Sequence, residues 1–346
     1  MPTTFEADGP APMDAEADAG DANESANVGE ELPEIRDIGC DRCGGETFRT
    51  LFRKASSRGT EYQLVSCTHC DLVQVNPQPN AAAVAPYYGA EYFTKRTDRG
   101  YDNYFSPELK AQIQKVYRQN LDDLGFFEYE EELRSDSWLR EHLGASAQPA
   151  LSGGDRRPAA LDLGCAAGYC VQYLAERGWD SRGVELSAAA AEYGIDELGL
   201  DIIVDDFLNC AELSANRFDL ITLWASIEHM HSPRAALARA YELLRPGGRM
   251  ILSTCRYGVL AKLRGPEWRF MNVPEHLYFF SLSGLAGLAE EIGFRTHSSV
   301  SYGSGFTTKA NASWLYRAAK RVADPLVKRL HQGDMMALHL VKPLSA

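Results

Sequence analysis

Four cysteines near the start of the chain have the type and spacing of metal ligands. They form two C-x-x-C pairs, Cys40 with Cys43 and Cys67 with Cys70, and 23 residues separate the pairs. Zinc binds four thiolates tetrahedrally, and each pair offers two of them at the right reach. A closed set of four thiolates leaves no position for water, so we expect a structural ion, with His69 as a bystander.

A glycine-rich turn and a later acidic residue have the spacing of a nucleotide-binding site. Gly164 and Gly168 follow the strand predicted at 159–163 and would let the backbone turn sharply and approach a ligand. Glu185 lies 21 residues after Gly164, where dinucleotide-binding folds place the acid for a ribose hydroxyl pair. This spacing predicts an adenosine-type cofactor. Because the turn reads G-x-x-x-G rather than G-x-G-x-x-G, an NAD-dependent oxidoreductase is less favoured.

Six short motifs between residues 159 and 300 follow the order of a known enzyme family. They are Asp162-Leu163-Gly164-Cys165-Ala166-Ala167-Gly168, Val184-Glu185-Leu186-Ser187, Asp205-Asp206-Phe207, Phe218–Trp224, Ile227-Glu228-His229 and Leu244-Arg245-Pro246-Gly247-Gly248-Arg249. Together they resemble the methyltransferases with a Rossmann-like fold that use S-adenosylmethionine (SAM). The resemblance implies SAM as the cofactor and methyl transfer by in-line displacement. The residues that it implies in cofactor binding are Asp162, Gly164, Cys165, Ala166, Gly168, Glu185, Leu186, Asp206, Phe207 and Trp224.

Histidines and tyrosines are the candidates for the chemistry of methyl transfer. A base must lie near the acceptor atom, and imidazole suits that task near neutral pH. Glu275 and His276 lie in a P-E-H-L-Y-F-F-S segment that resembles the sugar C-methyltransferases, in which the corresponding histidine is proposed as general base beside its glutamate. The same resemblance implies a tyrosine over the acceptor, at Tyr92 or Tyr88. His229, after the fourth predicted strand, is a second catalytic candidate.

The order of the segments also looks like that of the sugar C-methyltransferases and related small-molecule enzymes. The cysteine module is followed by Asn76-Pro77-Gln78-Pro79 and then by a tyrosine-rich stretch. The similarity implies a small-molecule acceptor, such as a sugar, a polysaccharide precursor or another metabolite. Val273 departs from the tyrosine that the sugar enzymes have there. The alternatives are an RNA methyltransferase that uses the ribbon to bind nucleic acid, a quinone-type O-methyltransferase, and a SAM-binding module without catalysis.

Short apolar strands alternate with helices from residue 159 onward. Strands are predicted at 159–163, 181–186, 201–204, 218–224, 249–254, 294–301 and 335–341. This alternation predicts an α/β fold with a doubly wound, mostly parallel, seven-stranded sheet of the Rossmann-like type. The expected organisation is an acidic, disordered tail at 1–37, a zinc ribbon at 38–79, a helical lid at 80–145, a linker at 146–158 and the SAM-dependent methyltransferase domain at 159–346.

The net charge of −13 is concentrated at the start of the chain, where residues 1–37 contain eleven acidic residues and one basic residue. The rest is close to neutral, so we do not expect a nucleic-acid partner. The sequence has neither a secretory signal pattern nor an apolar run near the roughly 18 residues that span a bilayer, so we expect a cytoplasmic protein. A basic amphipathic helix is predicted at 311–330, broken by Pro325 and interpreted as a solvated face.

Overall fold

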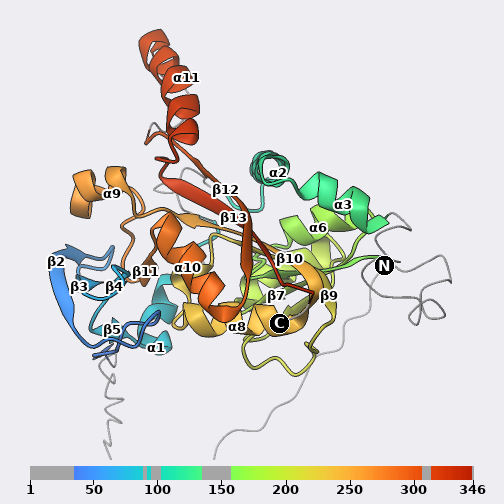
Figure 1. Ribbon diagram of the computed structural model, residues 1–346, viewed down its shortest axis with the longest axis horizontal. Helices are drawn as coiled ribbons and strands as arrows, with labels where there is room; N and C mark the ends of the chain where they lie inside the picture. The colour runs from blue at the N-terminus through green and yellow to red at the C-terminus, as the bar shows by residue number, and fades with distance from the viewer. Residues whose placement is uncertain (1–34, 89–91, 95–102, 135–156, 306–312, 345–346) are drawn as a thin grey trace, which may run out of the picture. The chain divides into compact units, whose positions relative to one another are not determined.

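The centre of the protein is a seven-stranded sheet. The computed structural model describes residues 35–88, 92–94, 103–134, 157–305 and 313–344. The strand order is β12-β13-β10-β9-β6-β7-β8 (Figure 1), and β13 runs antiparallel to both of its neighbours in an otherwise parallel sheet. The predicted fold class, a doubly wound and mostly parallel α/β sheet, is confirmed. The strands are β6 (Ala159–Leu163), β7 (Asp180–Glu185), β8 (Ile202–Val204), β9 (Phe218–Trp224), β10 (Leu244–Cys255), β12 (Arg295–Tyr302) and β13 (Met335–Val341).

Alternating side chains divide the core between the two faces of this sheet. In β6, Leu161 and Leu163 belong to one cluster of buried residues, whereas Ala160 belongs to another. Successive side chains of a strand point to opposite faces, so a strand that is covered on both sides reads as a continuous apolar run. The helices on the first face are α8 (Pro233–Leu243) and α10 (Leu282–Ile292), and those on the second are α2 (Pro107–Asp123), α3 (Phe126–Arg134) and α6 (Tyr169–Glu176) (Figure 1).

Several short elements lie in the connections between the strands. The connection between β7 and β8 contains α7 (Ala188–Glu192) and a π-helical turn, η4 (Tyr193–Glu197). The loop after β9 contains the 3-10 turn η5 (Ile227–His229). After β10 come α9 (Val259–Arg264) and η6 (Gly265–Glu267). The carboxyl ends of parallel strands meet at one edge of a sheet, here called the carboxyl edge, and ligands of such folds bind there.

The cysteine module forms a second sheet, which includes a strand from much later in the chain. Its strands are β2 (Phe48–Ala55), β3 (Glu61–Cys67), β4 (Val73–Val75) and β11 (Tyr278–Phe279), in the order β11-β4-β3-β2. A separate pair consists of β1 (Ile35–Arg36) and β5 (Gln78–Pro79). Because β11 begins two residues after His276, the module at 38–79 shares its sheet with the segment predicted to carry catalysis.

The described part of the region predicted as a lid is helical. It contains α1 (Ala81–Val84), η1 (Ala85–Tyr88), α2 and α3. Ser106 caps α2 by accepting the N–H of Leu109, and Pro107 lies in the first helical turn. Residues 1–34 of the predicted tail, residues 135–145 of the lid and most of the linker lie outside the described residues.

Helix α11 (Trp314–Arg329) shows that the prediction made for Pro325 is wrong. The proline lies within a continuous helix and does not break it. Proline removes one N–H donor, and on an exposed helix water can bind the carbonyl that loses its partner, so the cost is tolerated here. Within the described residues, every helix is too short or too polar to cross a membrane.

Candidate active site

The glycine turn follows β6 at the carboxyl edge and holds three residues in the left-handed region. The φ angle is 66° at Gly164, 49° at Ala166 and 73° at Gly168. Gly168 also precedes the first residue of α6, and a Cβ there would lie 2.6 Å from Leu200 Cδ1. The φ angle and this close approach both require glycine. Ala166 adopts the same region at a cost of about 1 kcal/mol, which glycine would avoid.

Glu185 is held against this turn by two backbone N–H groups. The N–H of Ala166 donates to Oε2 and the N–H of Ser187 donates to Oε1, each at 2.8 Å. Burial raises the pKa of Glu185, and the same backbone donors oppose that effect. The acid predicted to bind ribose is therefore a half-buried carboxylate whose two oxygens have a fixed orientation beside the turn.

Asp162 supports the turn from within the sheet. Only 3% of this residue is exposed, and Thr222 Oγ1 of β9 donates to its Oδ1 at 2.6 Å. Burial raises the pKa of Asp162 to about 7, with a further contribution from the charge of Glu185, and the Thr222 hydrogen bond acts in the opposite direction. Asp162 thus titrates near neutral pH at the base of the cofactor turn.

Two predicted cofactor residues lie next to Glu185 at the carboxyl edge. Leu186 directly follows β7, and its side chain is exposed. Asp206 follows β8, which pairs in parallel with β7, so both loops emerge on the same side. The Asp206 carboxylate accepts the N–H of Leu208 at 3.1 Å and the amide of Asn209 at 2.7 Å. The structure therefore brings Glu185, Leu186 and Asp206 together.

Three other predicted cofactor residues pack into the core. Cys165 Sγ packs against Gly183, where an added Cβ would lie only 2.5 Å from the sulfur. Cys165 therefore contributes to the turn through its backbone and not through its thiol. Phe207 belongs to the apolar cluster on one face of the sheet. Trp224, at the end of β9, donates its indole N–H to Cys170 Sγ at 3.1 Å. These contacts give each side chain a packing role.

Aromatic side chains from three separate segments meet beside the loop after β9. Tyr88 Oη lies 2.8 Å from His229 Nδ1, and the rings of His229 and His276 meet edge to face with centroids 4.6 Å apart. The centroids of Tyr88 and Tyr92 are 4.8 Å apart. The structure thus brings together the predicted catalytic residues. Tyr88, one of the two candidate tyrosines, lies within hydrogen-bonding distance of a histidine.

The backbone carbonyl of Glu275 determines the tautomer of His229. Its oxygen lies 2.7 Å from His229 Nδ1 and 3.3 Å from Tyr88 Oη. Because a carbonyl can only accept, His229 Nδ1 carries a proton and donates it to this oxygen. Glu275 therefore orients His229 through its backbone, while its own side chain is buried.

Glu228 is a member of this cluster to which sequence reasoning gave no role. Glu228, His229 and His276 offer ligand atoms that all lie within 4.8 Å of one another, and Glu228 and His276 are buried. On its other side, His276 Nδ1 lies 3.8 Å from Cys255 Sγ. Burial raises the pKa of Cys255 well above its ordinary value, so it is a neutral thiol. The only signal for Glu228 in the sequence is its position next to His229.

The glycine turn and the histidine cluster adjoin each other. Ser226, which lies two residues before Glu228, donates its hydroxyl to the carbonyl of Leu163 at 3.1 Å. A Cβ on Gly164 would lie 3.0 Å from the same hydroxyl oxygen. The loop after β9 therefore packs directly on the glycine turn.

Strand β11 and the cysteine module hold His276 in place. Leu277, the next residue, donates its N–H to the carbonyl of Glu228 at 2.8 Å and accepts the N–H of Val75 at 2.9 Å. One residue thus connects the catalytic segment to the loop after β9 and to β4. A shared apolar core reinforces this connection, and it includes Tyr62, Leu64, Val73, Val273 and Phe279.

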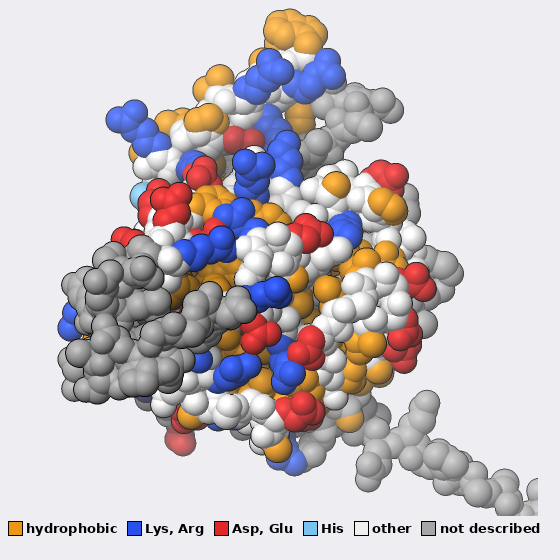
Figure 2. Space-filling view, turned by 90° about the vertical axis from the view of Figure 1, so that its right-hand side faces the viewer, with side chains coloured by type: hydrophobic (Ala, Val, Ile, Leu, Met, Phe, Trp, Pro, Cys, Tyr) orange, Lys and Arg blue, Asp and Glu red, His pale blue; other side chains and the backbone are white. Residues whose placement is uncertain are grey.

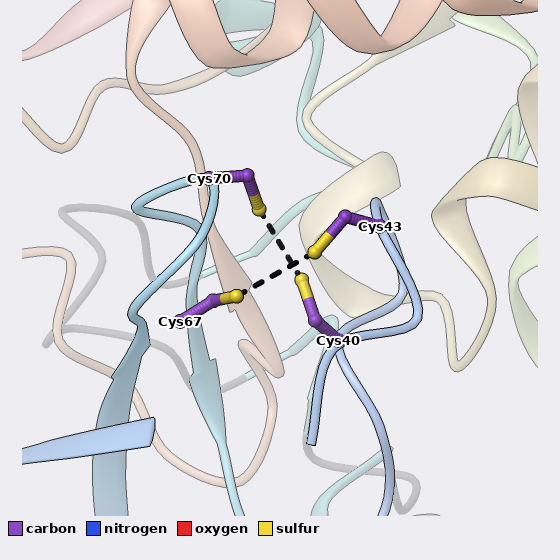
Figure 3. A group of neighbouring side chains, drawn as sticks. All are labelled: Cys40, Cys43, Cys67 and Cys70. Carbon is purple, nitrogen blue, oxygen red and sulfur yellow. Dashed lines mark hydrogen bonds between the residues drawn. The ribbon is translucent and has the colours of Figure 1, made fainter. Parts of the chain in front are cut away.

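The four cysteines of the module converge on one point (Figure 3). The sulfur atoms of Cys40 and Cys70 are 3.4 Å apart, those of Cys43 and Cys67 are 3.6 Å apart, and all four lie within 4.8 Å of one another. A tetrahedral ion with Zn–S bonds of about 2.3 Å holds its sulfurs about 3.8 Å apart, so the set fits zinc. Although burial raises it, backbone N–H groups lower the pKa of Cys67 to about 6 and favour the thiolate.

The fold and the glycine turn are typical of domains that bind an adenosine-type cofactor, and one known family matches part of the chain. Residues 129–299 match the family model described as a methyltransferase domain. This match supports the enzyme class predicted from the motifs. The sugar C-methyltransferase subgroup stays a prediction.

Individual relatives match the central part of the chain. It is 28% identical over 130 residues to a ubiquinone biosynthesis O-methyltransferase of Methylococcus capsulatus, which is 35% of this chain and 55% of that protein. A protein of the same name from Alkalilimnicola ehrlichii is 30% identical over 126 residues, 33% of this chain and 50% of the relative. The chain thus spans about half the length of these relatives. A crystal structure of a SAM-dependent methyltransferase from Archaeoglobus fulgidus is 18% identical, with a TM-score of 0.41 and coverage of 63% of this chain and 99% of that chain.

Proposed function

We propose that the protein transfers the methyl group of SAM to a small-molecule acceptor. The observation that carries the proposal is the pairing of the glycine turn with Glu185, whose oxygens are oriented by the N–H groups of Ala166 and Ser187. An acid at this position binds ribose hydroxyls in folds that hold adenosine-type cofactors. The methyltransferase match over residues 129–299 supports SAM as that cofactor.

The residues around the glycine turn are proposed to bind different parts of SAM. Gly164, Ala166 and Gly168 offer backbone at close approach, Glu185 accepts from the ribose, and Asp206 lies on the adenine side. When bound, SAM supplies a methyl group on a sulfonium centre, so the protein must position the acceptor and take up its proton. The half-buried rings of Tyr88 and Tyr92 beside the two histidines would limit the access of water to that step.

His276 is proposed as the base that removes the acceptor proton, and His229 as the residue that competes for this role. His276 is buried against Cys255, whereas His229 is oriented by the Glu275 carbonyl. Tyr88 and Tyr92 form the adjoining wall and would align the acceptor. A group that takes a proton must lie within hydrogen-bonding reach of it, and both rings meet at this one place.

Single variants distinguish the two histidines. We expect His276→Asn to lower kcat by a factor of about 10² to 10⁴ and to remove the acidic limb of the pH–rate profile, because the variant has no base to deprotonate. His229→Asn should change kcat less and leave that limb in place. The opposite result would assign the base to His229. Unchanged turnover in both variants, with SAM binding intact, would exclude a histidine base.

The relatives favour oxygen as the acceptor atom. Two of them are named ubiquinone biosynthesis O-methyltransferases, which makes a hydroxyl group of a quinone-type precursor the first acceptor to test. Sugar acceptors come second, from the resemblance of the cysteine module and the P-E-H-L-Y-F-F-S segment. The module's contacts within the protein weigh against RNA, since Arg42 and Arg234 bind Glu291 of α10 at 2.8 and 3.0 Å.

The test of the function is direct. Titration calorimetry of the full chain with SAM should show binding at one site, and Gly168→Ala should weaken it. Release of S-adenosylhomocysteine is then measured with hydroxylated quinone precursors, nucleotide sugars and RNA. SAM-dependent turnover of a small molecule supports the proposal. Turnover of RNA alone would replace it with the nucleic-acid reading, and a failure to bind SAM would refute it.

The cysteine cluster is proposed to hold one structural zinc ion. Its four sulfur atoms have the spacing of a tetrahedral site, and the N–H of His69, not its ring, points to Cys67 Sγ at 3.4 Å. Native mass spectrometry should find one zinc per chain. Cys70→Ser should lose the metal, whereas Cys210→Ser, which changes a buried cysteine outside the cluster, should keep it. Metal-free protein with unchanged stability would contradict this assignment.

A further inference from the structure

Helix α11 carries its large apolar side chains on the side that faces away from the protein. At 3.6 residues per turn, Trp314, Leu315, Ala318, Val322 and Leu326 lie along one side, and Leu330 continues it after the last turn. The exposed fractions are 70% for Trp314, 60% for Leu315, 71% for Val322, 53% for Leu326 and 57% for Leu330. A helix that packs on a globular core shows the reverse arrangement, with its apolar stripe inward.

The opposite side of α11 contacts the protein and fixes the orientation of the helix. Its half-buried residues include Tyr316, Ala323 and Val327. Asp324 accepts a hydrogen bond from Ser304, just after β12, and Lys328 Nζ lies 2.6 Å from Asp123 of α2. The outward apolar side is therefore a consequence of how α11 is attached, because these contacts occupy the polar side.

Basic residues border the exposed apolar side. Arg317 and Arg321 follow one edge of it, and Arg329 lies in the last turn. The helix contains five basic residues and a single acidic one, although the whole chain has a net charge of −13. Figure 2 shows orange and blue side chains side by side on the helix at the top of the view. The surface thus combines apolar area with positive charge.

This surface begins at the carboxyl edge of the sheet, where the candidate active site lies. Helix α11 connects β12 to β13, and Tyr302 at the end of β12 pairs with Met335 at the start of β13. Met335 also pairs with Cys255 at the end of β10, next to His276. The short helix α9, which follows β10, has the same composition: exposed Val259 and Leu263 beside Lys262 and Arg264.

We propose that α11 is an interfacial helix that docks the protein on an anionic lipid surface. Such a helix places its tryptophan and aliphatic side chains at the level of the head groups, and its cations bind anionic lipids. A second copy of the chain fits less well, because antiparallel pairing of the apolar sides would bring Arg321 of both copies together at the centre. The inference does not depend on the proposed methyl transfer.

Vesicle flotation with the full-length protein tests the proposal. We expect binding to vesicles of phosphatidylcholine with added phosphatidylglycerol, weaker binding to phosphatidylcholine alone, and a decrease with salt. Trp314 fluorescence should shift to shorter wavelength on binding, and the difference from Trp314→Phe isolates that signal. Because each basic residue contributes about a factor of five, Arg317→Gln combined with Arg321→Gln should bind about thirty-fold more weakly.

Two further variants complete the experiment. Leu315→Ser combined with Val322→Ser should lose about tenfold or more in vesicle binding, because both side chains would leave the lipid. Arg53→Gln combined with Arg217→Gln makes the same charge change at exposed positions outside α11 and should bind like the wild type. Equal binding of all variants, or no binding to anionic vesicles at low salt, would overturn the proposal.

Oligomeric state and SAM binding are measured on the same samples. A dimer that dissociates in the Leu315→Ser, Val322→Ser variant, without vesicle binding by the wild type, would assign the surface to a second copy and overturn lipid docking. SAM titration separates this test from the proposed function. If a variant loses vesicle binding but keeps its SAM affinity, the result bears on the proposed role of α11 alone. If SAM affinity is lost, the result bears on the proposed function of the glycine turn.

Discussion

Substitution of Glu185 by glutamine gives the sharpest test of the cofactor site. A carboxylate has about four lone-pair positions, and the N–H groups of Ala166 and Ser187 occupy one on each oxygen of Glu185. One position on each oxygen then remains for the two ribose hydroxyls. Glutamine has a single accepting oxygen, so its NH2 group must face one of the two backbone donors.

The expected loss follows from this count. Glu185→Gln removes the charge from both ribose hydrogen bonds and abolishes one of them, and hydrogen bonds to charged groups contribute about 1.5–3 kcal/mol each. We therefore expect a loss of about 2 kcal/mol in SAM binding, which is a dissociation constant about thirty-fold higher. Because the N–H group that faces the new amide loses its acceptor, the free energy of unfolding of the variant should also decrease by about 1 kcal/mol.

Titration calorimetry with SAM measures the first effect and urea unfolding the second. Glu192→Gln, at an exposed position of α7, makes the same charge change next to the site and should bind like the wild type. Because burial raises the pKa of Glu185 and the ribose needs the ionised form, wild-type affinity should fall as the pH decreases towards that pKa. Affinity of Glu185→Gln within threefold of the wild type would refute the assignment of this residue to the ribose.

Three other outcomes follow from the same geometry. The folded-state pKa of Asp162 is about 7, against an ordinary value of 3.8, so ionisation of this group opposes folding increasingly from about pH 4 to pH 7. In urea unfolding at pH 8, Asp162→Asn should therefore be more stable than the wild type by up to about 4 kcal/mol. At pH 4 the variant should have no such advantage. Gly168→Ala should lower the free energy of unfolding by about 2–3 kcal/mol, because of the φ angle of Gly168 and the close approach of Leu200. Gly199 has a similar φ angle and open space around it, so Gly199→Ala should cost about 1 kcal/mol. Equal losses in thermal unfolding would contradict the packing argument. Removal of the proposed zinc should lower turnover as well as the melting temperature, because β4 supports His276 through Leu277; full turnover of metal-free protein would show that support to be dispensable.

The sheet could be predicted because its information is local. Each strand is a short apolar run, each connection carries turn residues, and the resulting alternation leaves few topologies. The glycine turn and Glu185 could also be predicted, because the pattern consists of one strand and the number of residues between Gly164 and Glu185. Pro325 was misread because its effect depends on the exposure of α11, which the helix sequence alone does not give.

The catalytic cluster was only partly predictable because it is assembled from distant segments. His229 and His276 were named from motifs, but their contact depends on Leu277, which joins two loops that are far apart in sequence. The short distance between Tyr88 and His229 likewise could not be predicted from the motifs. Glu228 gave no signal beyond its neighbour, since its burial follows from the packing of the loop after β9 on the glycine turn.

The pairing of β11 with β4 changes what the cysteine module contributes. A ribbon attached by a linker would stabilise only itself, and its metal would have no effect on chemistry elsewhere. Here Tyr278 and Phe279 pair with Gln74 and Val73, and Leu277 accepts the N–H of Val75. The backbone on the carboxyl side of His276 is therefore fixed by a strand that lies between the second pair of cysteines and Pro77. Because misplacing a catalytic group by about 1 Å can cost a hundredfold in rate, the proposed zinc ion would affect catalysis by His276 through this sheet without touching the acceptor.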